Sequence, residues 1–134
     1  MEIYRICWNE AMQMVRLLAR GLQDKRVWGI PRGGQVVATL MAYQGCKLVK
    51  FATEAEVIVD DIADTGTTLF RRTHDTSIKT LGLPTATLIV RNSCTTPPNH
   101  YIMRFYARDY VLFPWEDEEE AFEYVRLRKE NDSE

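Results

Sequence analysis

An apolar run that ends in paired acids and a Thr/Gly turn constrains this chain most. The β-branched run Val57–Val59 predicts a buried strand, and Asp60, Asp61 and Asp64 follow it. The turn Thr65–Thr68 should then open a helix, where free backbone N–H groups can bind a phosphate. Ligands of open α/β sheets bind just outside the carboxyl ends of the strands. The stretch therefore indicates a sugar-phosphate site; the alternative is a plain strand, turn and helix with solvated acids.

A second strand and turn of the same kind lies earlier in the chain. Val27–Ile30 is apolar, Pro31–Gly34 follows it, and 35–43 has helical character. Paired glycines let the backbone approach a ligand closely, and Arg32 offers a fork of donors to an anion. Many strands end in a Gly-Gly turn, so this signal is weak by itself. Together with the first turn it predicts two neighbouring anion sites at one edge of a sheet.

Strands and helices alternate along the chain. Apolar residues at helical spacing predict a packing helix over Glu10–Leu22, with Asn9 as its N-cap. Further helices are expected at 66–81 and 117–129, and further strands at 86–90, 101–106 and 110–113, with a loop at 92–100. This order predicts an α/β fold with an open, doubly wound parallel sheet. The length predicts a single domain over residues 1–134.

The connection before Val57 is unusually short. A strand at 45–51 would leave only Ala52–Glu56 before the next strand begins. Parallel strands normally need a connection of about a dozen or more residues, whereas this extended segment reaches only roughly 17 Å. The earlier strand must therefore be short, bent out of the sheet, or part of the return path.

Composition limits the classes of function. The net charge of −2 gives no overall attraction to nucleic acid or to an anionic membrane. Cys7, Cys46 and Cys94 form no CxxC pair, so neither a disulfide framework nor a zinc site is supported. The acidic block Glu116–Glu120 is typical of a solvated helix start. Without an apolar run of membrane-spanning length or a secretory signal, the protein is expected to be cytoplasmic.

Three segments resemble type I phosphoribosyltransferases. Val57–Thr68 is similar to the phosphoribosyl-pyrophosphate motif of that family, and Ile30–Gly34 looks like its pyrophosphate loop. Tyr110–Glu116 resembles the base-binding end segment of the xanthine/guanine branch. The resemblance implies the family fold with a small hood and a shortened or missing edge strand and lid. It also implies a non-proline cis peptide bond at Pro31–Arg32.

The same resemblance implies a function. Members of the purine branch transfer 5-phosphoribosyl from phosphoribosyl pyrophosphate to a 6-oxopurine (guanine, xanthine or hypoxanthine), with Mg²⁺ as cofactor. The products are the nucleoside monophosphate and pyrophosphate. Positioning and electrostatics do most of the catalysis in such a reaction. A homodimer is also implied.

Residue roles can be carried over from the family motif. Asp60 and Asp61 would hold the ribose hydroxyls, and Asp61 would also hold Mg²⁺ through water. Asp64 would act near purine N7 as hydrogen-bond partner or general acid/base. The expected 5′-phosphate site is the turn made of Asp64, Thr65, Gly66, Thr67 and Thr68.

The remaining expected contacts concern pyrophosphate and the base. Arg32 and Gly33 would bind pyrophosphate. Arg91 stands where purine members commonly have a lysine that reads the 6-oxo group; the alternative is a surface arginine at a strand end. Tyr110 and Val111 would flank or hydrogen-bond the base.

The chain departs from the family just before the main motif. Active members carry a long mobile loop there, which closes over the transition state; here the segment is only Lys50–Glu56. One reading is an enzyme that works without this lid, with a neighbouring subunit covering the site. A second is a catalytically weak or inactive regulatory protein that binds nucleotide or phosphoribosyl pyrophosphate. A third is an enzyme that hydrolyses the activated sugar.

Overall fold

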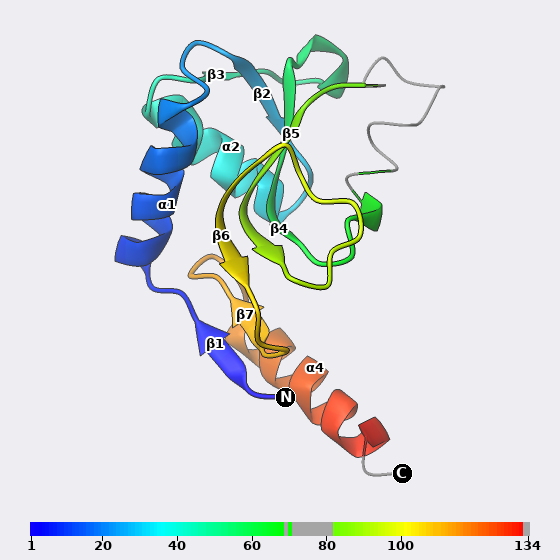
Figure 1. The fold of residues 1–134 in the computed structure, drawn as a ribbon. Helices are drawn as coiled ribbons and strands as arrows, with labels where there is room; N and C mark the ends of the chain where they lie inside the picture. The colour runs from blue at the N-terminus through cyan, green and yellow to red at the C-terminus, as the bar shows by residue number, and fades with distance from the viewer. Residues whose placement is uncertain (69, 71–81, 133–134) are drawn as a thin grey trace. The chain divides into compact units, whose positions relative to one another are not determined.

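A computed structural model describes residues 1–68, 70 and 82–132. The chain forms two compact units (Figure 1). The larger unit is Met12–Tyr106, and the smaller one combines both ends of the chain, Met1–Ala11 and Ala107–Glu134. That residues 1–134 form a single domain stays a prediction.

The larger unit is built on a five-stranded sheet in which every pair of neighbours is parallel, in the order β3-β2-β4-β5-β6 (Figure 1). The strands are β2 (Arg26–Gly29), β3 (Lys47–Leu48), β4 (Val57–Ala63), β5 (Thr85–Arg91) and β6 (His100–Phe105). The expected α/β fold with an open parallel sheet is confirmed.

The central strands β4 and β5 carry the core of this unit. Ile58, Val59, Leu88 and Ile89 are completely buried, as expected for parallel strands covered on both faces. The buried Thr87 is accommodated because its hydroxyl donates to the Ile89 carbonyl at 2.9 Å. A polar side chain in the core costs little when it is hydrogen-bonded.

Helix α2 (Gly33–Tyr43) follows β2 and packs on β2 and β4. Its buried face contains Gly34, Val37, Ala38 and Met41. Because α2 begins at Gly33, the glycine turn predicted to bind an anion is also the first turn of a helix. The N-terminus of a helix favours negative charge.

Helix α1 (Trp8–Arg20) begins earlier than predicted, and the prediction of Asn9 as its N-cap was wrong. Cys7 and Glu10 cap the helix instead. The Glu10 N–H donates to Cys7 Sγ at 3.5 Å, and the Cys7 N–H donates to Glu10 Oε1 at 3.3 Å. This reciprocal pair follows the capping-box pattern with sulfur in place of a hydroxyl.

The predicted helix at 66–81 lies mostly outside the described residues. Its start is described: Thr67, Thr68 and Phe70 are helical. The Phe70 N–H donates to the Gly66 carbonyl at 2.9 Å, which places Gly66 at the beginning of the first turn.

The short connection before β4 is possible because the preceding strand is very short and a 3₁₀ turn follows it. Strand β3 contains only Lys47–Leu48, and η1 (Ala52–Glu54) follows it. Leu48 and Val57 pair with the same residue, Val27, from its two sides. The predicted alternative of a short strand is confirmed.

The smaller unit pairs the two chain ends in a two-stranded parallel sheet. Strands β1 (Ile3–Arg5) and β7 (Tyr110–Leu112) form this sheet, and α4 (Glu118–Asp132) follows. Strand β1 was not predicted. Asp117 Oδ1 accepts the Glu119 and Glu120 N–H groups at 2.8 and 3.4 Å, so the acidic block is a helix start as expected. Within the described ranges, no helix is long and apolar enough to cross a membrane.

Candidate functional site

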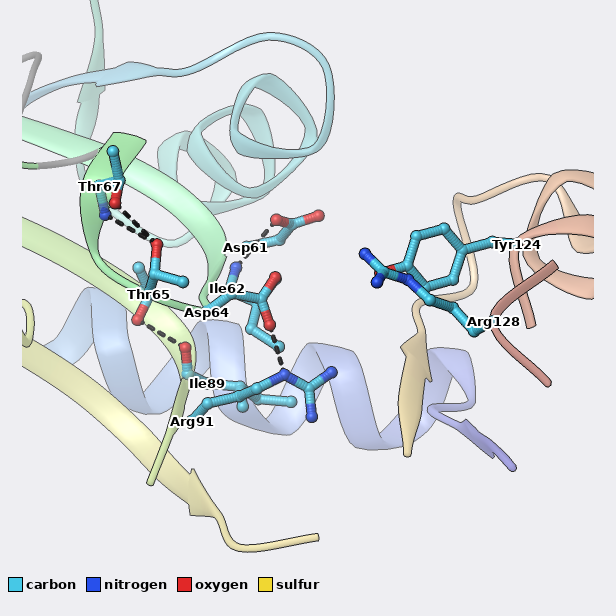
Figure 2. A network of polar contacts seen from close by, with 10 residues as sticks. Asp61, Ile62, Asp64, Thr65, Thr67, Ile89, Arg91, Tyr124 and Arg128 are labelled. Carbon is cyan, nitrogen blue, oxygen red and sulfur yellow. Dashed lines mark hydrogen bonds and ion pairs between the residues drawn. The ribbon is translucent and has the colours of Figure 1, made fainter. Parts of the chain in front are cut away.

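Three loops meet at the carboxyl edge of the large sheet because β2, β4 and β5 are parallel neighbours. Ile30–Gly34 follows β2, Asp64–Thr68 follows β4, and the segment Asn92–Asn99, here called the β5 loop, follows β5. Figure 2 shows the polar contacts around the end of β4. The predicted neighbouring turns are therefore found at one edge.

The acid pair lies in the second half of β4, and each carboxylate accepts from the next backbone N–H. Asp60 Oδ1 accepts the Asp61 N–H at 2.9 Å. Asp61 Oδ1 accepts the Ile62 N–H, also at 2.9 Å (Figure 2). Burial, and next the negative charge of Asp61, raise the pKa of Asp60 to about 8. Two adjacent carboxyl groups resist ionising together. The pair is thus suited to a ligand that brings positive charge or hydroxyl donors.

The donor set of this pair fits Mg²⁺ only together with a ligand. In the described part of the chain, no group of three or more His, Cys, Asp and Glu side chains is placed to hold a metal ion. Mg²⁺ in phosphate-binding sites typically takes one or two carboxylates and completes its shell with water and substrate oxygens. Asp60 and Asp61 supply that number of carboxylates.

The glycine turn after β2 lies directly against the acid pair. The predicted cis peptide bond at Pro31–Arg32 is present. A Cβ atom at Gly33 would lie 1.9 Å from Asp61 Oδ2, and one at Gly34 would lie 2.5 Å from the Val59 carbonyl oxygen. The structure therefore brings the predicted pyrophosphate residues next to the predicted ribose and metal residues.

The turn after β4 has the geometry of a capped helix start. Gly66 has φ of 86°, a conformation that favours glycine. The Thr65 hydroxyl accepts the Thr67 N–H at 3.2 Å and donates to Thr67 Oγ1 at 2.9 Å (Figure 2). Thr65, Thr67 and Thr68 are exposed, so a phosphate can reach this turn.

Asp64 and Arg91, predicted for proton transfer and for base recognition, form an ion pair with each other. Arg91 Nε donates to Asp64 Oδ1 (Figure 2). The Arg91 guanidinium also lies 5.6 Å from the centroid of the Phe105 ring. Only 17% of the Arg91 side chain is exposed, compared with 59% for Asp64. The Arg91 side chain is therefore mostly buried and paired with Asp64, which differs from the alternative of a surface arginine at a strand end. Its role toward a base stays a prediction.

The β5 loop contacts the turn after β4, and the sequence pattern did not predict this contact. The Thr95 backbone N–H and hydroxyl both donate to the Thr65 carbonyl, each at 3.3 Å. A Cβ atom at Gly66 would lie 2.0 Å from Thr96 Oγ1. The sequence had indicated only a Ser/Thr/Pro-rich connection. Its place directly after Arg91, at the end of a central strand, was the available signal.

The other predicted base-binding residues belong to the smaller unit. The Tyr110 hydroxyl donates to Glu116 Oε2 at 3.1 Å, and its ring centroid lies 5.2 Å from that of Tyr124. Tyr124 in turn accepts from Arg128 Nε at 3.2 Å (Figure 2). Val111 is buried in strand β7, at 5% exposure. Their role toward a base stays a prediction.

Comparison with known proteins identifies the fold. No protein-family model matches the chain, and no curated protein matches it. Among solved structures, the purine phosphoribosyltransferase from Pyrococcus horikoshii matches with a TM-score of 0.70 and 21% identity, over 87% of this chain and 96% of that one. The xanthine-guanine-hypoxanthine phosphoribosyltransferase from Helicobacter pylori matches with 0.62 and 13%, over 92% and 99%.

A third solved structure is a hypothetical protein from Neisseria gonorrhoeae with bound ppGpp. It matches with a TM-score of 0.61 and 13% identity, over 97% of both chains. At these identities the likeness shows the fold. The chain has the fold of the purine phosphoribosyltransferases, as the sequence motifs predicted.

Proposed function

We propose that this protein is a purine phosphoribosyltransferase. It would transfer 5-phosphoribosyl from phosphoribosyl pyrophosphate to guanine, xanthine or hypoxanthine, and release the nucleoside monophosphate and pyrophosphate. The observation that carries the proposal is the contact of the Gly33 turn with Asp61 on one side of β4. Together with the fold, it supports adjacent sites for pyrophosphate and for ribose.

Each part of the substrate would meet a separate segment of the chain. Asp60 and Asp61 would accept hydrogen bonds from the ribose hydroxyls, and Asp61 would also hold Mg²⁺ through water. The N-terminus of α2, with Arg32 and Gly33, binds pyrophosphate. The turn Asp64–Thr68 binds the 5′-phosphate. Mg²⁺ supplies charge neutralisation for the pyrophosphate when it is bound.

The chemical step would depend on holding the charges in place. The bond from ribose C1 to the pyrophosphate oxygen breaks as a bond to a purine nitrogen forms, and the base loses a proton. Asp64 would accept that proton, and its ion pair with Arg91 would fix the orientation of the carboxylate. Arg91 would also donate to the 6-oxo group. Catalysis of this kind comes mainly from orientation and preorganised charge.

The second candidate function is a regulatory protein that binds purine nucleotide or phosphoribosyl pyrophosphate without transfer. The specific observation in its favour is the segment 49–56, which contains the 3₁₀ turn η1 in the place where active relatives carry a lid. Arg26 Nε donates to the Glu54 carbonyl at 2.9 Å, and the Glu56 N–H donates to the Arg26 carbonyl at 2.8 Å. These hydrogen bonds fix the segment against Arg26 of β2.

One assay separates the candidates. The purified chain is incubated with phosphoribosyl pyrophosphate, Mg²⁺ and each of guanine, hypoxanthine, xanthine and adenine, and nucleotide and pyrophosphate are quantified. Nucleotide from a 6-oxopurine, at a rate above that of an Asp64→Asn control, supports the transferase. Pyrophosphate without nucleotide would instead indicate hydrolysis of the activated sugar.

Binding measurements complete the test. Calorimetric titration with GMP, ppGpp and phosphoribosyl pyrophosphate, each with Mg²⁺, would favour the regulatory candidate if binding is tight and no product forms. Absence of binding by all three would contradict both candidates. The expected homodimer, in which a neighbouring subunit covers the site, is tested by sedimentation with and without ligand.

A further inference from the structure

The β5 loop is anchored at both of its ends. At the start, the Asn92 N–H donates to the Phe105 carbonyl at 2.9 Å. At the end, Asn99 Oδ1 accepts the Thr85 N–H at 2.9 Å, and the Asn99 N–H donates to Thr85 Oγ1 at 3.3 Å. The loop is thus fixed to β5 and β6 on each side of its middle.

A tight turn in the loop brings Thr95 to the turn after β4. The Cys94 N–H donates to the Arg91 carbonyl at 3.0 Å, which reverses the chain. Thr95 then donates twice to the Thr65 carbonyl, from its N–H and from its hydroxyl, each at 3.3 Å. Two prolines, at positions 97 and 98, follow and restrict the backbone further.

The contact continues on both sides of Thr65. Arg91 holds Asp64, and Thr96 packs on Gly66 so closely that a Cβ there would lie 2.4 Å from the Thr96 carbonyl oxygen. Successive residues of the turn therefore meet first the end of β5, at Arg91, and then the β5 loop, at Thr95 and Thr96. A contact of this length fixes the turn as a unit.

The bond to the Thr65 carbonyl has a direct consequence for the next N–H group. The carbonyl of Thr65 and the N–H of Gly66 belong to the same planar trans peptide unit and point in opposite directions. When Thr95 holds the carbonyl, the direction of the Gly66 N–H is also fixed. Backbone N–H groups of such a turn are the donors that bind a phosphate.

We propose that Thr95 is a positioning residue for the 5′-phosphate site: by holding the Thr65 carbonyl, it aims the Gly66 N–H at the phosphate. This inference rests on the proposed function, which places the phosphate at the turn. A turn fixed in advance loses less conformational freedom when the ligand binds. The β5 loop would thus hold the phosphate-binding turn in a fixed conformation. In enzymes that have a closing lid, the lid supplies part of this ordering.

The test compares Thr95→Val, which removes the hydroxyl but keeps the branched shape, with Thr95→Ser, which keeps the hydroxyl. The Kd of the full chain is measured by calorimetry for GMP and, separately, for pyrophosphate with Mg²⁺. Thr95→Val should weaken GMP binding about three- to tenfold, the loss expected for one hydrogen bond. The Kd for pyrophosphate should change less than about twofold in Thr95→Val. Thr95→Ser should bind GMP and pyrophosphate with the affinities of the wild-type protein.

A second readout needs no ligand. Amide hydrogen exchange of Gly66 and Thr67 in the free protein should be several-fold faster in Thr95→Val than in Thr95→Ser. Unchanged GMP affinity with unchanged exchange would overturn the inference, and so would equal weakening of GMP and pyrophosphate, which indicates a general loss of structure. If the wild-type protein binds no 5′-phosphate ligand, the proposed function fails. The exchange rates of Gly66 and Thr67 then still test whether Thr95 fixes the turn.

Discussion

Arg91 at the end of β5 forms an ion pair with Asp64 in the turn after β4, joining two neighbouring strands at their carboxyl ends. The pair also joins two roles, because Asp64 is proposed to accept a proton from the base and Arg91 to read its 6-oxo group. A lysine, with its flexible stem and single point of charge, would hold Asp64 less rigidly. The arginine therefore orients the Asp64 carboxylate, and under the proposed function it would also orient the base.

Replacing Arg91 with alanine should lower kcat for nucleotide formation by about tenfold or more, since a hydrogen bond to a charged group contributes about 1.5–3 kcal/mol. The free energy of unfolding should fall by less than about 1 kcal/mol, because the Asp64 side chain is 59% exposed and solvent screens the pair. Steady-state kinetics and urea unfolding measure the two effects. Arg91→Lys, which keeps the charge, should be intermediate; full kcat in Arg91→Ala would contradict the positioning role.

Asp60 should make the stability of the protein depend on pH. Its pKa is about 8 in the folded chain and 3.8 in the reference state, so the folded chain binds more protons between these values. The free energy of unfolding should therefore decline as the pH rises from about 4 to 8. Urea unfolding across this range measures the decline.

The control for this dependence is Asp60→Asn, which cannot ionise at that position. Its stability advantage over the unchanged protein should be close to zero near pH 4 and reach on the order of a few kcal/mol at pH 8. Two stability curves that stay parallel over the whole range would show that Asp60 does not titrate there.

The two glycines of the β2 turn should respond differently to alanine. In Gly33→Ala the new Cβ meets the end of the Asp61 side chain, which can rotate away, so the fold should persist. Pyrophosphate binding with Mg²⁺ should weaken by about tenfold, the effect of about 1.4 kcal/mol, because Asp61 is displaced. In Gly34→Ala the Cβ meets the Val59 carbonyl of β4, so the free energy of unfolding should drop by about 1–3 kcal/mol. Titration and urea unfolding of both variants check this contrast, and equal effects on both quantities would contradict it.

Asn99 should stabilise the protein through one acceptor atom. Thr85 is buried at 6% exposure and its N–H donates to Asn99 Oδ1, so Asn99→Ala should cost about 1–3 kcal/mol by leaving that N–H without its partner. Asn99→Asp keeps the accepting oxygen and should lose clearly less. Chemical unfolding of the two variants decides the point; equal losses would mean that the amide nitrogen or the packing matters instead.

Local sequence patterns allowed strand β4, its acid pair and the glycine turn after β2 to be predicted. The β-branched run before Asp60 and the glycine turn at Gly33 are each local features, and parallel neighbours bring their carboxyl ends together by geometry. The cis peptide bond at Pro31–Arg32 came from the family resemblance and is present. What the acids and glycines do to a ligand stays a proposal.

The features that were missed depend on partners distant in the sequence. Strand β1 exists because it pairs with β7 at the other end of the chain, and its own three residues show no alternation of burial. The bonds from Thr95 to Thr65 likewise join two loops that only the sheet brings together. The cap at Cys7 was missed for another reason: sulfur is a weak acceptor and is not expected at an N-cap.

Val27 is paired with Leu48 on one side and with Val57 on the other, at the same level of the sheet. The register of β3 and of β4 is therefore set by β2 and not by the chain that joins them. Lengthening such a connection costs little, because loop-closure entropy grows slowly with length. The segment between Leu48 and Val57 could therefore gain or lose residues without shifting the pairing of β4 with β2.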